Sequence, residues 1–540
     1  MPKTSPVLAR LTWMLAIASV SLLTFTADNA SAQSEQTSAG KLNHNELAKF
    51  IDQKVNARLQ QNKMDVSGGC TDAEFIRRVY LDILGAIPPA EKVAAFLDST
   101  DTNKRAKLID ELLDNPQYGK RFAEIWSNAV IPSDSNVRRL SGEYLENWLA
   151  ERLNKNVGWD EIVRDIVTAK GEYTEKNGAT TFFIANPAPD KLTDKATQLF
   201  LGVQLQCAQC HDHPFTEYKQ EEYWAMAAFF MQTRISGNPN QAAKKGRSII
   251  ITEADAGKKA RKLRLPPEAK IVPAKFLSGP KAEVAKNKPY RPVLAEWMTS
   301  KENKYFARAI SNKLWYNFFG RGLVNPVDDM HDDNPASHPE LLAGLAEQMK
   351  ANDFDLKYLI RAICNSESYQ RSSRPTGNNV DDQELFSRAL VRNMTPEQLY
   401  DSYETVLQQD KARAAALKKA KRKTKNNRNA VTFRSRFVDS FGKDVIFNPL
   451  EYQAGIPQAL QMMNSRLLGN SNYLIVNVMK SSKTPEDAIE QIFLSTVSRR
   501  PTEAELTRLS KYVADQSNPR NAYGDVIWAL LNSSEFSTNH

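Results

Sequence analysis

The chain has 540 residues, 72 Lys and Arg against 63 Asp and Glu, and a formal net charge of +9. Single hydrophobic cores stop growing well below this length, so two or more domains are expected. Nine of the cations lie in residues 411–428, which hold no acid. The excess positive charge is therefore local: this run is typical of a solvated helix or loop, the alternative being a polyanion site. Without a zinc-finger, helix-turn-helix or RNA-recognition signature, no nucleic-acid partner is expected.

The N-terminus has the three parts of a secretory signal peptide. Lys3 and Arg10 precede an apolar run over residues 11–26, and small residues at Ala30 and Ala32 form a cleavage site. Residues 1–32 are therefore predicted to be removed, leaving a secreted or periplasmic chain without a stable membrane span. The alternative is a retained membrane anchor, for which the apolar run is short.

Helix start and stop signals dominate the chain that follows. Thr71 and Glu74 have capping-box spacing before an apolar stripe that stops at Gly85. Helices are also expected to begin after Thr395, Thr484 and Thr502, each of which precedes a suitable first-turn residue. The pattern predicts a mainly α protein.

Strand-like runs are few, and the best are TTFFIA (180–185) and RSIIITEA (247–254). The second lies in a stretch rich in Lys, Gly and Pro, which predicts a linker or small β-containing insert at 236–275. Two largely helical domains, 33–235 and 276–540, are expected on either side of it.

The densest group of chemically active residues is Cys207, Cys210, His211 and His213. Residues 194–206 have roughly helical apolar spacing, so the thiols are expected at the end of an amphipathic helix, with Cys207, Cys210 and His211 sharing one face. His213 is expected to leave that face, because Pro214 disfavours helical backbone before it.

Three interpretations of this group compete. The C-x-x-C-H spacing is that of covalent haem c attachment, with two thiols for the vinyl groups and an adjacent imidazole for the iron. The same donors suit a structural zinc ion, although all four fall in one short stretch. The third interpretation is a Cys207–Cys210 disulfide or two buried thiols. Cys70 and Cys364 are isolated in sequence and do not decide between them.

The sequence resembles a known pair of domains. The stretches that carry the resemblance are AEFIRRVYLDILGAIPP, ATQLFLGVQLQCAQCHDHPF, YFARAISNKLWYNFFGRGLVNPVDDM, NPASHPELLAGLA and ALLNSSEF. They are similar to the cytochrome-c-associated domain of unknown function of secreted planctomycete proteins, followed by its C-terminal companion domain. The resemblance implies no established activity, since the cytochrome label follows the C-x-x-C-H motif and occasional fusion to a cytochrome c domain.

A second group of candidate ligands lies at 325–342, which the resemblance places in the companion domain. Residues 328–333 form an acidic loop, in which Asp328, Asp329, Asp332 and Asp333 offer oxygen ligands. His331 and His338 offer imidazoles. A six-coordinate iron would need a distal donor, for which His331, His338 and Met226 are the candidates. This loop is therefore expected to lie near the Cys/His group. The competing interpretation is loop and cap chemistry, with Ser337 and Glu340 capping the next helix.

No sequence signature supports a hydrolase or a nucleotide-dependent enzyme, because G-x-S-x-G, H-E-x-x-H and Walker-type motifs are absent from the sequence. Two function classes remain. One is an exported c-type haem protein that transfers electrons, or uses its iron for redox chemistry on a partner or small substrate. The partner expected for it is an exported redox protein. The other is a non-redox secreted binding or assembly protein whose Cys/His group is a zinc site or disulfide.

Overall fold

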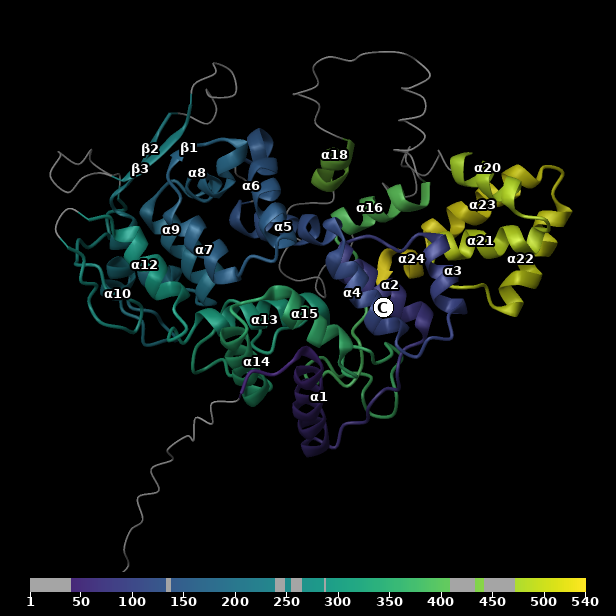
Figure 1. Cartoon of the computed structure of the whole chain (residues 1–540), viewed down its shortest axis with the longest axis horizontal. Helices are drawn as coiled ribbons and strands as arrows, with labels where there is room; N and C mark the ends of the chain where they lie inside the picture. Colours follow the sequence, from purple (N-terminus) through teal and green to yellow (C-terminus); the bar gives the residue numbers. More distant parts are fainter. Residues whose placement is uncertain are drawn as a thin grey trace, which may run out of the picture. The chain divides into compact units, whose positions relative to one another are not determined.

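The computed structural model describes residues 40–132, 137–237, 248–253, 265–285, 288–407, 433–440 and 472–540. The expected signal peptide and the basic run 411–428 lie outside these residues. The protein is mainly α (Figure 1). Residues 40–540 form one compact unit. The expected division at 236–275 stays a prediction.

The first part of the unit is built almost entirely from helices. They are α1 His44–Gln61, α2 Asp72–Leu84, α3 Ala90–Asp98, α4 Lys104–Asp114, α5 Pro116–Val130, α6 Val137–Asn154, α7 Trp159–Thr168, α8 Thr181–Ala185, α9 Pro189–Ala196 and α10 Gln220–Ala227. Single turns of other helix types are η1 Glu175–Thr180, η2 Thr197–Leu201, η3 Gln206–Gln209 and η4 Ala228–Phe230.

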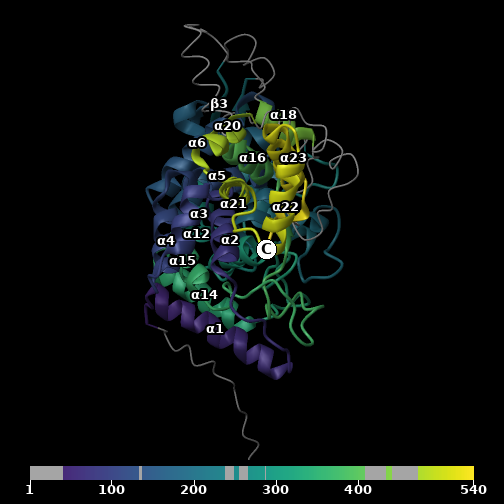
Figure 2. The same cartoon turned by 90° about the vertical axis from the view of Figure 1, so that its right-hand side faces the viewer.

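The later part is also mainly helical. Its helices are α12 Tyr290–Thr299, α13 Phe306–Phe319, α14 Pro339–Ala351, α15 Leu356–Asn365, α16 Pro396–Leu407, α18 Phe433–Ser440, α20 Asn472–Ser481, α21 Pro485–Thr496, α22 Glu503–Asp515, α23 Pro519–Leu531 and α24 Ser534–Ser537. Helix α1, from the start of the described chain, lies beside α14 and α15 in both views (Figures 1 and 2), where the Leu42 N–H donates to Gln348 Oε1 at 2.9 Å.

The described strands are short and antiparallel. β1 (Gly171–Glu172) and β2 (Thr233–Ser236) both pair with β3 (Ile250–Glu253), where Ile235 lies opposite Ile251. β4 (Arg392–Asn393) pairs with β5 (Thr538–Asn539). The strand expected within 247–254 is therefore confirmed, as β3.

The strand expected at TTFFIA is wrong, because residues 181–185 form helix α8. All five side chains are buried, Phe182 lies 6.0 Å from Phe200 between ring centroids, and Arg291 lies over the Phe183 ring. A short apolar run buried on every side has the same composition in a strand and in a helix, so its periodicity does not separate the two.

The expected helix starts are confirmed. Thr71 accepts a hydrogen bond from the Glu74 N–H, and α2 ends at Gly85 with φ of 79°. Thr484 and Thr502 cap α21 and α22 with reciprocal side-chain contacts, and Thr395 accepts from the Gln398 N–H at the start of α16. Each cap satisfies backbone donors that the first helical turn leaves without partners.

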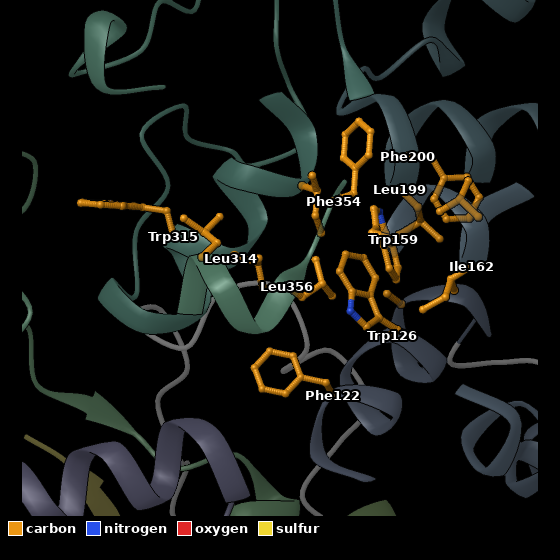
Figure 3. Packing of buried hydrophobic residues seen from close by; sticks show 14 of the residues in the cluster. Phe122, Trp126, Trp159, Ile162, Leu199, Phe200, Leu314, Trp315, Phe354 and Leu356 are labelled. Carbon is orange, nitrogen blue, oxygen red and sulfur yellow. The ribbon is translucent and has the colours of Figure 1, made fainter. Parts of the chain in front are cut away.

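The larger hydrophobic core draws side chains from both regions expected to be domains, from Leu47 to Leu494. At its centre Trp126 and Trp159 lie 4.2 Å apart between ring centroids, and Trp159 also meets Phe200 (Figure 3). A second cluster joins Leu81 and Ile87 to α16, α20, α21 and α23. The first core lies directly under the segments that carry the Cys/His group.

Candidate functional site

The Cys/His group begins on the short 3₁₀ turn η3 instead of at the end of a long helix: Cys207 lies in the turn, Cys210 caps it, and His211 and His213 follow it. Helix α9 ends at Ala196, η2 adds one π turn to Leu201, and Gly202 ends it with φ of 69°. The expectation of a helix through residue 206 is therefore wrong. Glycine adopts positive φ without steric cost, so it stops the helix before the motif.

Helix α10 holds this turn through the turn's own carbonyl groups. The Trp224 indole N–H donates to the Gln209 oxygen at 3.1 Å, and the Gln220 amide donates to the Cys210 oxygen at 2.9 Å. Ala208 is buried beneath the turn, whereas Cys207 and Cys210 are exposed free thiols. The backbone is anchored and the two sulfurs face solvent.

His211 is exposed, and its ring contacts the backbone. Its Nδ1 lies 2.6 Å from the carbonyl oxygen of Asp212. A carbonyl oxygen only accepts hydrogen bonds, so Nδ1 is the donor, and in a neutral ring Nε2 keeps its lone pair. Metal-ligating histidines in proteins are commonly held in this way.

His213 is half-buried and takes part in the loop that follows the turn. Its N–H donates to the Tyr218 oxygen at 2.8 Å, and its Nδ1 accepts from the Phe215 N–H at 3.2 Å. Burial lowers the pKa of His213, with the positive charge of His331 nearby as a further cause. Since its Nδ1 already accepts a hydrogen bond, His213 stabilises the loop at 213–218 and does not extend the exposed surface that His211 forms.

The acidic loop packs against the segment that leads to the motif. Asp328 is buried and accepts hydrogen bonds from the side-chain amides of Gln198 and of Gln204, the latter at 3.0 Å. The Met330 N–H donates to the Gly202 oxygen at 2.9 Å. A β-carbon at position 202 would lie 3.1 Å from the Met330 sulfur, so this contact needs glycine.

Asp328 also faces two lysines. Burial lowers the pKa of Lys313 and of Lys195, and the Asp328 carboxylate opposes both shifts. The burial of Asp328 is explained by these two lysines, which balance its charge, and by the two glutamine amides, which donate to its oxygens. Asp329 Oδ2 lies 3.6 Å from His331 Nε2, and the Asp329 carbonyl accepts from Asn334.

The remaining predicted ligands are buried elsewhere. Met226 is fully buried in α10. His338 is buried at the start of α14, 5.4 Å from the Phe386 ring, with Nδ1 3.0 Å from Ser337 Oγ. Ser337 therefore contacts His338 rather than capping the helix, because His338 itself occupies the N-cap position. Burial lowers the pKa of His338 to about 4, and the positive charge of Arg58 adds to the shift.

A cavity of about 750 Å³ lies between the loop after the motif, the start of α13 and the acidic loop. The residues that line it are Pro214, Phe215, Thr216, Glu217, Tyr218, Lys304, Tyr305, Arg308, Val324, Met330, His331, Asp332, Asp333, Asn334, Pro335, Ala336 and Pro339. The tertiary structure thus brings His331 and the acidic loop to the region of the motif. His338 and Met226 do not line the cavity.

The sequence reasoning missed the wall contributed by α13. Lys304 and Arg308 line the cavity together with Tyr305, whose hydroxyl lies 3.3 Å from that of Tyr218. Arg308 lies in the first turn of α13 and Lys304 lies just before the helix. Their position opposite the acidic loop was not visible in the sequence.

Within the described ranges, no three or more His, Cys, Asp and Glu side chains form a group that could hold a metal ion. Likewise, no helix in the part of the chain that the structure describes is long and apolar enough to cross a membrane.

Comparison with known proteins gives two family matches. A family model described as PSCyt2, protein of unknown function (DUF1549), matches residues 50–235. A second, described as PSD1, protein of unknown function (DUF1553), matches residues 290–513. No curated protein and no solved structure matches the chain. The C-x-x-C-H turn and the acidic loop therefore lie in different matched regions.

Proposed function

Since the chain belongs to the PSCyt2 family over residues 50–235 and to the PSD1 family over 290–513, both of unknown function, we propose that it is an exported c-type haem protein with a redox role. Cys207 and Cys210 would hold the haem through thioether bonds, and His211 would bind its iron. Export rests on the signal peptide predicted from residues 1–32. The partner expected for electron transfer is another exported redox protein.

The observation that carries this proposal is the contact between His211 Nδ1 and the Asp212 carbonyl, at 2.6 Å. It leaves Nε2 as the free nitrogen, on an exposed ring next to two exposed thiols. Thioether formation needs accessible sulfurs, and iron ligation needs an unprotonated imidazole nitrogen. The donor set therefore fits haem c.

The chain's own contribution is to position these three groups. Trp224 and Gln220 hold the backbone of the turn from α10, so the thiols keep their spacing while their side chains stay accessible. A bound haem c supplies one-electron redox chemistry at its iron.

Covalent attachment has a direct test. In a host that attaches haem to exported proteins, the purified protein should keep a Soret band and a haem-stained gel band after boiling in detergent, since thioether bonds survive denaturation. The Cys207→Ser/Cys210→Ser double variant should lose both signals. Cys364→Ser, which alters a buried thiol outside the motif, is the matched control and should keep them. A colourless wild-type protein with the mass of the bare mature chain would refute the proposal.

The alternative function is a non-redox secreted binding or assembly protein. The observation behind it is that both thiols are free and exposed, and thiolates are common zinc ligands. About one equivalent of zinc, lost in Cys207→Ser, would identify a structural zinc site. A metal-free chain lighter by two hydrogens would identify the disulfide.

A further inference from the structure

Charges of both signs line the cavity without neutralising one another. Lys304 and Arg308 come from the start of α13, whereas Asp332 and Asp333 come from the acidic loop. All four side chains are exposed. In the described part of the chain none of them has an ion-pair partner. A basic wall, Lys304 and Arg308, and an acidic wall, Asp332 and Asp333, therefore line one cavity without pairing with each other. Glu217 adds a further carboxylate from the loop after the motif.

The basic wall is not explained by the stability of its helix. The N-terminal end of a helix carries partial positive charge, so a cation there is unfavourable. Arg308 lies in the first turn of α13, which begins at Phe306, and Lys304 lies just before the helix. An anionic group bound between them would be attracted to both cations and to the helix end.

The cavity also offers an apolar surface. Phe215 is 73% exposed although it is a large aromatic residue. Tyr218 and Tyr305 also line the cavity, and their hydroxyls lie 3.3 Å apart. A volume of about 750 Å³ suits a small organic ligand or a short peptide.

We propose that this cavity binds a short zwitterionic peptide. Its carboxylate lies at Lys304 and Arg308, its ammonium group lies toward Asp332 and Asp333, and an apolar side chain covers Phe215. A ligand with separated charges of both signs complements both walls, whereas a simple anion or cation complements only one. This binding does not depend on haem at the Cys/His turn.

Three peptides test the proposal by calorimetry. Glycyl-phenylalanyl-glycine carries both terminal charges, its N-acetyl form lacks the ammonium group, and its C-terminal amide lacks the carboxylate. We expect saturable binding of the first, and binding at least about tenfold weaker for each capped form, as is usual when a charged hydrogen-bonding group is removed.

Paired variants assign each terminus to its wall. Lys304→Gln/Arg308→Gln should weaken the zwitterionic peptide about tenfold or more and leave the amidated peptide unchanged. Asp332→Asn/Asp333→Asn should weaken the zwitterionic peptide and leave the N-acetyl peptide unchanged. Lys301→Gln is the matched control, because this exposed lysine pairs with Asp353 and does not line the cavity.

The outcome separates this proposal from that of haem attachment. The Cys207→Ser/Cys210→Ser variant should lose the haem signal and still bind the peptide. Absence of saturable binding by the wild-type protein would overturn the peptide proposal, as would equal affinity for the free and the capped peptides.

Discussion

At the scale of single residues, His338 combines burial with an unpaired polar atom. Its Nε2 is buried without a hydrogen-bond partner, its ring lies against Phe386, and the pKa is lowered to about 4. In the folded protein the ring is therefore neutral at pH 7. A buried neutral imidazole makes stability depend on pH, because the unfolded chain takes up the proton first.

The sign of this dependence is definite. The folded pKa of about 4 lies below the ordinary histidine pKa of 6.5, so the contribution of His338 to stability is complete above pH 6.5 and is lost as the pH falls toward 4. The loss should reach roughly 3 kcal/mol, at about 1.4 kcal/mol per pKa unit. Chemical denaturation of wild type and His338→Gln at pH 7 and pH 4.5 measures it. If the variant loses as much stability on acidification as the wild type, His338 is not the group responsible.

At the scale of elements, Gly202 decides where a helix stops and what packs against its end. Its positive φ ends η2, and its carbonyl accepts the Met330 N–H. The same position thus sets the direction of the chain toward Cys207 and anchors the acidic loop. Residues 194–206 have a helical apolar pattern on both sides of Gly202. A prediction from this pattern alone therefore places the end of the helix too late in the chain.

We expect Gly202→Ala to destabilise the protein by about 1–2 kcal/mol, because an L-residue in left-handed backbone is strained. The added methyl group would also press on the Met330 sulfur and Ala309, so peptide binding in the cavity should weaken. Gly524→Ala is the control: a β-carbon there has only ordinary contact with Ile475. Thermal unfolding and calorimetry give both readouts, and unchanged values for Gly202→Ala would contradict the assigned role.

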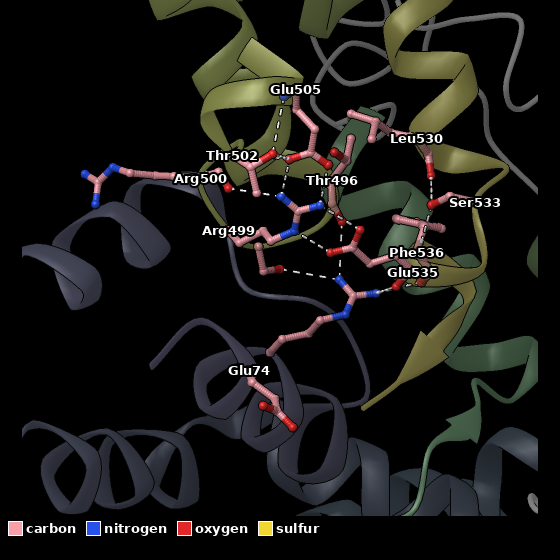
Figure 4. A network of polar contacts seen from close by, with 12 residues as sticks. Glu74, Thr496, Arg499, Arg500, Thr502, Glu505, Leu530, Ser533, Glu535 and Phe536 are labelled. Atoms are coloured by element: carbon pink, nitrogen blue, oxygen red, sulfur yellow. Dashed lines mark hydrogen bonds and ion pairs between the residues drawn. The ribbon is translucent and has the colours of Figure 1, made fainter. Parts of the chain in front are cut away.

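At the scale of the whole described unit, α2 holds the C-terminal segment. Arg77 is fully buried and donates to the carbonyl oxygens of Thr496, Glu535 and Phe536. Burial lowers its pKa to about 10, so it stays charged at neutral pH. Beside it Arg499 lies between Glu505 and Glu535 (Figure 4). The contacts of Arg77 join the first matched region to the end of the second and to the chain beyond it.

Arg77 also donates to the Thr538 carbonyl oxygen. Arg77→Met should therefore cost at least about 4 kcal/mol, from four carbonyl groups left without their donor at roughly 1 kcal/mol each. Arg500→Met removes an exposed arginine whose partners are Glu490 and Asp98, and it should cost no more than about 1 kcal/mol. Denaturant unfolding of both variants gives the comparison. Similar costs for the two would show that the buried contacts of Arg77 do not stabilise the unit.

The sequence by itself determined the mainly α class, the capped helix starts at Thr71 and Thr502 and the presence of the C-x-x-C-H group. These features depend on neighbouring residues, whose backbone preferences and cap contacts act over one or two turns. The prediction for TTFFIA failed because burial on all sides, rather than composition, decides whether a short apolar run is helical.

Only the tertiary structure decided what surrounds the motif. The hydrogen bond between Gln204 and Asp328 spans 124 residues, and no local pattern encodes such a pairing. Packing of α13 and the acidic loop against the segment around Gly202 brings Arg308 and Asp332 to one cavity. The physical reason is that contacts between distant segments follow from the shape and burial of the shared core, which becomes defined only when the helices pack together.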